Sequence, residues 1–197
     1  MTLLTVYTDG DAPEKVLESE EAADIALALK EIDVRFERWE VAEEFADGGD
    51  QQAILDHYRA DVARVIEAEG YVLVDVTQLH RTEDQGWEDL KTAARNKFLS
   101  EHTHDDDEVR FFVSGSGIFY LHTQGKVYAV LCEAGDLLSV PANTTHWFDM
   151  GTDPDFTAIR FFHDPNGWVG VPTGSDIAVR FPDFDEVRAR AFAAGGA

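Results

Sequence analysis

The sequence contains a single cysteine, Cys132, and only six prolines. One thiol excludes an intrachain disulfide and a metal site built from several cysteines, so we expect Cys132 to be a small buried core residue. No apolar run is long enough to span a bilayer, and no charged and apolar leader precedes the first strand. We therefore expect a cytoplasmic protein that has no membrane contact.

Positive charge is also scarce. The 197 residues include 16 Lys and Arg against 39 Asp and Glu, which gives a formal net charge of −23 at pH 7. Nucleic acids and anionic membrane surfaces bind clusters of Lys and Arg, so this balance argues against both as partners. An anionic small molecule would be repelled by the same overall field. A site for such a molecule must therefore carry its own local cations.

Apolar residues are plentiful enough to build a core. Hydrophobic residues make up 44% of the sequence and aromatic residues 11%, as in globular proteins and unlike disordered ones. A length of 197 residues suits one domain with a sizeable core. We expect a single domain over 1–197 that is a monomer, because no apolar surface stripe is left after core residues are assigned.

The two halves of the chain differ in their patterns. Before residue 100, strands alternate with helices expected near 20–32, 51–69 and 83–99, and the third of these should bury Trp87, Leu90, Ala94 and Phe98. After Glu101, short strands follow one another, with hairpin turns expected at 114–117 and 124–126. The sequence thus predicts an α+β, mainly β fold: a small antiparallel sandwich or barrel with helices packed outside, mostly from the N-terminal half.

One stretch of the second half combines residues that bind metals. His102, His104 and Glu108 are all even-numbered, so they share one face with Arg110 if the segment is extended. A strand, a Pro/Asn turn and a further strand start then deliver the imidazole of His146. Three imidazoles and a carboxylate without a thiolate suit Fe, Ni, Mn or Co better than a structural Zn. Four protein ligands leave open positions in an octahedral shell, where a deprotonated enediol could bind through two oxygens.

An enediolate carries negative charge into an apolar cavity and needs cations beside it. Arg110 and Arg160 are the candidates, although either could instead form a structural ion pair with a nearby Asp or Glu. Phe98, Phe148 and Trp168 are candidates for an apolar wall, or for ordinary core packing. The four other histidines should have surface or hydrogen-bonded roles, and the acidic run at 105–107 should be a solvated loop between ligands.

The two ligand stretches together resemble the paired motifs of the cupin superfamily. In that superfamily the first motif supplies two His and one Glu, and the second supplies one His. Asn143 stands where many cupins have Gly, and Met150 where many have Asn, but neither position is a metal ligand. The resemblance implies a double-stranded β-helix, or jelly-roll, barrel whose metal-binding core spans about residues 98–172.

Longer stretches are similar to the acireductone dioxygenase family. The likeness lies in 34–39, 97–113, 146–151, 156–160 and 167–168, and it extends to about Asp176. It implies an enzyme of methionine salvage that cleaves 1,2-dihydroxy-3-keto-5-methylthiopentene with O2. With Fe(II) the implied products are formate and 4-methylthio-2-oxobutanoate. With Ni(II) they are formate, carbon monoxide and 3-methylthiopropanoate.

The family resemblance also implies roles for the metal ligands and Arg110. It makes His102, His104, Glu108 and His146 the ligands of one Fe2+ or Ni2+ per chain. Arg110 would promote formation of the substrate dianion. Our own hypothesis, separate from the resemblance, is that the remaining candidates, Arg160, Phe98, Phe148 and Trp168, shape the bound pose.

Two alternatives stay open at this point. One is another cupin oxygenase or isomerase, acting for example on a β-diketone or a sugar. The other is a non-catalytic cupin that binds a metal or small ligand, such as a sensor. The long helical N-terminal half and Arg110 favour the dioxygenase over the first. A sensor would usually carry a DNA-binding or signalling domain, and none is visible.

Overall fold

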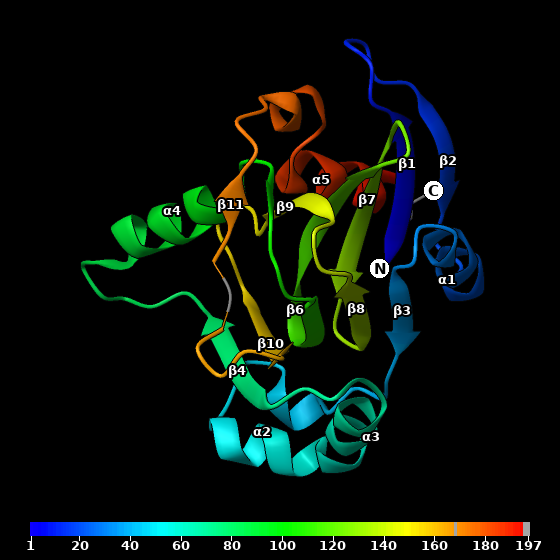
Figure 1. Ribbon diagram of the computed structural model, residues 1–197. Helices are drawn as coiled ribbons and strands as arrows, with labels where there is room; N and C mark the ends of the chain where they lie inside the picture. Colours follow the sequence, from blue (N-terminus) through cyan, green and yellow to red (C-terminus); the bar gives the residue numbers. More distant parts are fainter. Residues whose placement is uncertain (168, 195–197) are drawn as a thin grey trace.

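The computed structural model describes residues 1–167 and 169–194, and an antiparallel sheet of 11 strands lies at its centre (Figure 1). Strand β6 (Glu108–Thr123) has 16 residues and belongs to both halves of this sheet. Its first part pairs with β8 and β10, and its second part pairs with β7 and β9. The two halves share one buried apolar cluster, which includes Val130 of one half and Leu138 of the other. The α+β, mainly β architecture predicted from the sequence is confirmed.

Each half of the sheet has its own strand order. One half runs β11-β5-β9-β6-β7-β1-β2 and contains β1 (Leu3–Thr8), β2 (Lys15–Ser19), β5 (His102–Thr103), β7 (Lys126–Glu133), β9 (Thr145–Asp149) and β11 (Val171–Pro172). The other half runs β4-β10-β6-β8-β3 and contains β3 (Arg35–Arg38), β4 (Leu73–Leu79), β8 (Asp136–Val140) and β10 (Phe156–Phe162).

Helices cover the outer faces of both halves (Figure 1). Helices α2 (Gln51–His57) and α3 (Arg59–Glu69) pack on the outer side of β6, β8 and β10. Helix α5 (Phe184–Ala194) and the 3-10 turn η2 (Ile177–Arg180) pack against the other half. The remaining helical elements are α1 (Ala22–Lys30), η1 (Glu43–Phe45) and α4 (Trp87–Phe98). Within the described ranges, no helix is long and apolar enough to cross a membrane.

The hairpin turn predicted at 114–117 is wrong, because β6 continues through these residues. Gly115 has φ +70, and the register of β6 against β10 shifts between Thr157 and Ala158. A positive φ and a shifted register in one strand are the marks of a β-bulge. Glycine and serine favour a bulge as well as a turn, so composition alone did not distinguish the two.

The bulge reverses which residues of β6 face the interior. Before it, even-numbered residues such as Phe112 join the inner cluster, while odd-numbered Phe111 packs outward against α2 and α3. After it, odd-numbered Phe119 joins the inner cluster and even-numbered Tyr120 packs toward α5. One inserted residue therefore exchanges the two faces of the strand.

The helices in the first half also differ from the sequence pattern. The single helix expected over 51–69 is two helices that meet at Tyr58, whose side chain is buried and whose hydroxyl accepts a hydrogen bond from the Ala42 N–H. The helix expected near 20–32 is present but begins at Ala22, after β2 ends at Ser19. Leu90 was expected to be buried but is 56% exposed, whereas Trp87 on the same helix is buried.

Asp136 is a fully buried carboxylate at the start of β8. Its Oδ2 accepts hydrogen bonds from Thr2 Oγ1 at 2.6 Å and from the Glu133 N–H at 2.9 Å, and its Oδ1 lies 3.3 Å from Arg38 Nε. Burial outweighs these partners and raises the pKa of Asp136 to about 6. The folded state thus binds the proton more tightly than the unfolded chain. Stability should fall as the pH rises from about 4 to about 6, and the loss should be complete at pH 7.

We expect Asp136→Asn to raise the free energy of unfolding at pH 7 by about 1–3 kcal/mol, because an amide is not penalised for charge on burial. At pH 4 the gain should largely disappear, since Asp136 is then protonated in the folded protein. Urea unfolding of metal-free protein at both pH values measures this difference, with the exposed Asp47→Asn as the control. An equal gain at pH 4 and pH 7 would show that ionisation of Asp136 is not the cause.

Candidate metal centre

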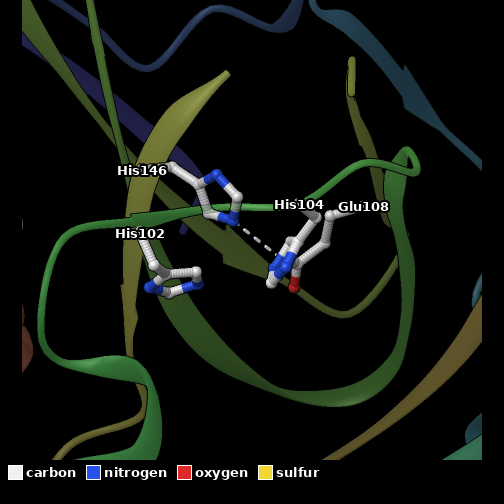
Figure 2. Close-up of side chains that lie close together, drawn as sticks. All are labelled: His102, His104, Glu108 and His146. Carbon is white, nitrogen blue, oxygen red and sulfur yellow. Dashed lines mark hydrogen bonds and ion pairs between the residues drawn. The ribbon is translucent and has the colours of Figure 1, made fainter. Parts of the chain in front are cut away.

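Four side chains converge, from the strands β5, β6 and β9 and from the loop between β5 and β6 (Figure 2). His102 lies on β5, His104 in the loop that follows, Glu108 at the start of β6, and His146 on β9. Each offers one ligand atom, and these atoms all lie within 4.8 Å of one another. All four residues are buried, with at most 4% of their surface exposed. The structure thus brings together the four residues that the sequence singled out.

Backbone carbonyls determine which ring nitrogen two of the histidines present to the centre. His102 Nδ1 lies 2.6 Å from the Ser100 carbonyl oxygen, and His146 Nδ1 lies 2.7 Å from the Thr144 carbonyl oxygen. A carbonyl can only accept, so each Nδ1 must be the protonated nitrogen. Each Nε2 of the neutral imidazoles is therefore left with a lone pair directed into the site. Metal-binding histidines commonly show this arrangement.

The Nε2 lone pairs of His102 and His146 have no donor to accept from in the described part of the chain when both imidazoles are neutral. His146 Nε2 lies 2.8 Å from Glu108 Oε2, so two acceptors face each other when His146 is neutral. His102 Nε2 is buried and has no hydrogen-bond partner among the described residues. A divalent metal would satisfy both observations, and the donor set of three imidazoles and one carboxylate fits Fe, Ni, Mn or Co. The residues present therefore fit a bound metal.

Charge inside the site is balanced by Arg110. Burial by itself would raise the pKa of Glu108, but the Arg110 guanidinium and the hydrogen bonds from His104 and His146 outweigh it and hold that pKa well below its usual range. Burial lowers the pKa of His102, which favours the neutral form that binds metals. Burial also acts to lower the pKa of His146, yet its contact with Glu108 raises it. A proton therefore competes with a metal for His146.

Arg110 is held in a buried aromatic setting. Its Nε donates a 2.7 Å hydrogen bond to Glu108 Oε1, and only 3% of the residue is exposed. The centre of its guanidinium lies 5.2 Å from the Phe148 ring, 5.8 Å from the Phe98 ring and 5.9 Å from the Phe119 ring. Its Nη2 has no hydrogen-bond partner among the described residues. The amino group Nη2, with its two N–H donors, is thus left over for a ligand, in an environment where an unsatisfied charge is costly.

Phe119 was not among the site residues expected from the sequence. Its ring lies 4.6 Å from the ring of Phe148, directly across the pair of strands β6 and β9. Phe148 in turn has room because residue 117 is glycine, where an added Cβ would lie 2.4 Å from the Phe148 ring. Phe119 could have been found only by recognising the bulge, because the residues on the inner face are even-numbered before it and odd-numbered after it.

Arg160 forms a structural ion pair, which was one of the two roles that the sequence left open for it. It lies opposite Arg110 on β10, but its guanidinium donates to both oxygens of Asp75 at 2.8 and 2.6 Å. Together with Phe98 it lines a cavity of about 220 Å3. The structure therefore places Arg160 beside the aromatic wall with an ion pair of its own. Trp168, the other expected wall residue, lies outside the described residues.

The loop between His104 and Glu108 is not simply a solvated run of acids. Asp106 is 8% exposed and its carboxylate accepts several hydrogen bonds, so the expectation of a solvated loop is wrong for this residue. Asp105 is exposed, as expected. The other histidines all lie against carboxylates, as their expected hydrogen-bonded roles imply: His57, His80, His122 and His163.

Comparison with known proteins agrees with this geometry. A family model described as the ARD/ARD' family matches residues 4–170. The chain belongs to the acireductone dioxygenase family. The family's model spans both ligand segments, the bulged strand β6 and Arg110. The resemblance inferred from the sequence is therefore confirmed.

Individual relatives cover nearly the whole chain. An acireductone dioxygenase of Saccharopolyspora erythraea is 56% identical over 189 residues, covering 96% of this chain and 99% of the relative. One of Frankia alni is 53% identical over 194 residues, covering 98% of this chain and 94% of the relative. A solved acireductone dioxygenase from Bacillus anthracis, with a cadmium ion in its active center, has a TM-score of 0.71 at 30% identity. That match covers 87% of this chain and 98% of the other.

Proposed function

We propose that this protein is a metal-dependent acireductone dioxygenase of methionine salvage. Its substrates would be 1,2-dihydroxy-3-keto-5-methylthiopentene and O2. The observation that carries the proposal is the buried set of His102, His104, Glu108 and His146 with Arg110 bonded to its carboxylate. Family membership over residues 4–170 supports the same reaction.

The metal we propose is one Fe2+ or Ni2+ per chain. The three imidazoles and Glu108 would hold it, and when bound it would supply Lewis-acid chemistry to the substrate oxygens. We propose formate and 4-methylthio-2-oxobutanoate as the products of the iron form. For the nickel form we propose formate, carbon monoxide and 3-methylthiopropanoate. We further propose that the chain is one domain and acts as a monomer in the cytoplasm.

Arg110 would stabilise the anionic form of the substrate. Its Nη2 offers a charged donor in a buried site, where electrostatic interactions are stronger than in water. Phe98, Phe119 and Phe148 pack around the guanidinium and restrict where it can move. An arginine held in this way also supplies the local cation that a protein of charge −23 needs to bind an anion.

The choice between product sets would depend on which substrate oxygens face the metal. We propose that Arg160, Phe98, Phe148 and Trp168 shape this pose, because the first three lie beside Arg110. Product analysis of variants at these four positions tests the idea. Unchanged product ratios in all of them would contradict it.

Replacing Arg110 by methionine should separate catalysis from metal binding. We expect kcat/KM to fall by about 10²–10³-fold, the usual effect of losing one donor to a developing anion. The metal content of the loaded protein should change much less, since all four ligands stay. Oxygen uptake with an acireductone analogue and metal analysis of the same sample measure the two effects. The exposed Arg59→Met is the matched control. Activity within threefold of the control would remove Arg110 from the mechanism.

A further inference from the structure

Two carboxylates within the ligand loop hold that loop in place. Asp106 Oδ1 accepts a hydrogen bond from the Asp107 N–H at 2.8 Å, and Asp106 Oδ2 accepts one from the His163 N–H at 2.8 Å. The imidazole Nδ1 of His163 lies 2.6 Å from Oδ1, and the Asp164 N–H donates to Oδ2 at 3.3 Å. This single buried side chain therefore ties the ligand loop to the residues that follow β10.

Asp107 connects the ligand loop to a different segment, the turn that precedes β9. Its Oδ1 accepts a hydrogen bond from the Ala142 N–H at 2.9 Å, and its Oδ2 accepts one from the Tyr71 hydroxyl at 3.1 Å. Beside it, the Asn143 N–H donates to the His104 carbonyl oxygen at 2.7 Å. Residues 141–143 form the turn before His146. Asp107 thus links the segment that carries His104 and Glu108 to the segment that carries His146.

The third acid of the run provides a contrast. Asp105 is exposed, and within the described part of the chain its side chain has no hydrogen bond or ion pair. Only the two acids nearer to Glu108 are engaged with the backbone on both sides of the loop. Solubility alone would not require this difference, because exposed acids would serve that purpose equally well. A carboxylate is also the one common side chain that can accept four hydrogen bonds while donating none.

We propose that Asp106 and Asp107 are positioning residues of the metal centre. They hold the loop so that His104 and Glu108 already face His102 and His146 before the metal binds. The inference rests on the proposed function only in assuming that these four residues bind a metal. It does not depend on the reaction. Groups that orient ligands in this way commonly change metal affinity by about 10–100-fold when they are replaced.

The test compares Asp106→Asn and Asp107→Asn with Asp105→Asn as the matched control. The dissociation constant of Ni(II) is measured by competition with a chelator, and the visible spectrum of the Co(II) form reports ligand geometry. We expect the first two variants to bind Ni(II) about 10–100-fold more weakly and to show a changed Co(II) spectrum. Asp105→Asn should match the wild type in both measurements.

Tyr71→Phe is a second probe in case either asparagine variant fails to fold. It removes only the hydroxyl that donates to Asp107 and keeps the ring, so we expect Ni(II) binding about 5-fold weaker. A purely structural role would lower the melting temperature of the metal-free variants and leave the Ni(II) constant and the Co(II) spectrum unchanged. Constants within twofold of the control for all folded variants would overturn the inference. If the wild-type protein binds Ni(II) but does not turn over acireductone, the result would count against the proposed reaction and not against this inference.

Discussion

Replacement of Glu108 by alanine should abolish both metal retention and turnover. Glu108 is the only anionic member of the ligand set, and its Oε2 lies 3.1 Å from His104 Nε2 and 2.8 Å from His146 Nε2. Its Oε1 also accepts the Arg110 hydrogen bond. The variant therefore loses a metal ligand and leaves a buried guanidinium without its counter-charge. Removing one partner of a buried pair costs about 3–5 kcal/mol of stability.

Metal analysis and urea unfolding of the purified Glu108→Ala variant measure the two effects separately. Glu67→Ala, an exposed glutamate on α3, is the control for a loss of negative charge. Glu108→Gln keeps the side-chain volume and should lose less stability than alanine, although it should still hold metal poorly because its amide oxygen is a weaker ligand. A Glu108→Ala protein that retains one metal per chain would contradict the assignment of the site.

Replacement of Gly115 by alanine should be strongly destabilising. A Cβ at this position would lie 1.8 Å from the Asp155 carbonyl oxygen and 2.6 Å from the Phe156 Cα. Both are backbone atoms, one in the residue before the neighbouring strand β10 and one in its first residue, so β6 and β10 would have to separate. The positive φ of Gly115 adds strain for any residue with a side chain. We expect a loss of at least about 3 kcal/mol in the free energy of unfolding.

Gly125→Ala is the matched control for this prediction. Gly125 has φ +72, close to the +70 of Gly115, but a Cβ there would meet nothing within 4 Å. The control thus carries the same backbone strain without the clash, and we expect a loss of about 1 kcal/mol. Urea unfolding of both variants gives the comparison. Equal losses would show that the close contact between β6 and β10 is not the cause of the destabilisation.

The bulge also explains what could and could not be predicted from the sequence. Alternation correctly placed Glu108, Arg110 and Phe112 on one face, because these residues lie in one regular part of β6. Alternation across 114–117 failed, since one extra residue exchanges the faces and nothing in the composition distinguishes a bulge from a turn. Phe119 was overlooked for this reason.

Apart from the metal ligands, the partners of individual charged residues in distant segments could not be predicted from the sequence. The pairing of Arg160 with Asp75 depends on the register of β10 against β4, which no local pattern reveals. The same holds for Asp106, whose partners follow β10. His102 and His104 were found through their spacing, although the chain between them and Glu108 is a loop and not one extended strand. Ligand chemistry, more than strand geometry, identified this site.

The most direct test is a turnover assay on metal-stripped protein that is reconstituted anaerobically with either Fe(II) or Ni(II). Each form receives acireductone and O2, and the keto acid and carbon monoxide are both quantified. The proposed function predicts 4-methylthio-2-oxobutanoate with iron, carbon monoxide with nickel, and no oxygen uptake without metal. No oxygen uptake with either metal, in protein shown to hold one metal per chain, would contradict it and favour another cupin activity.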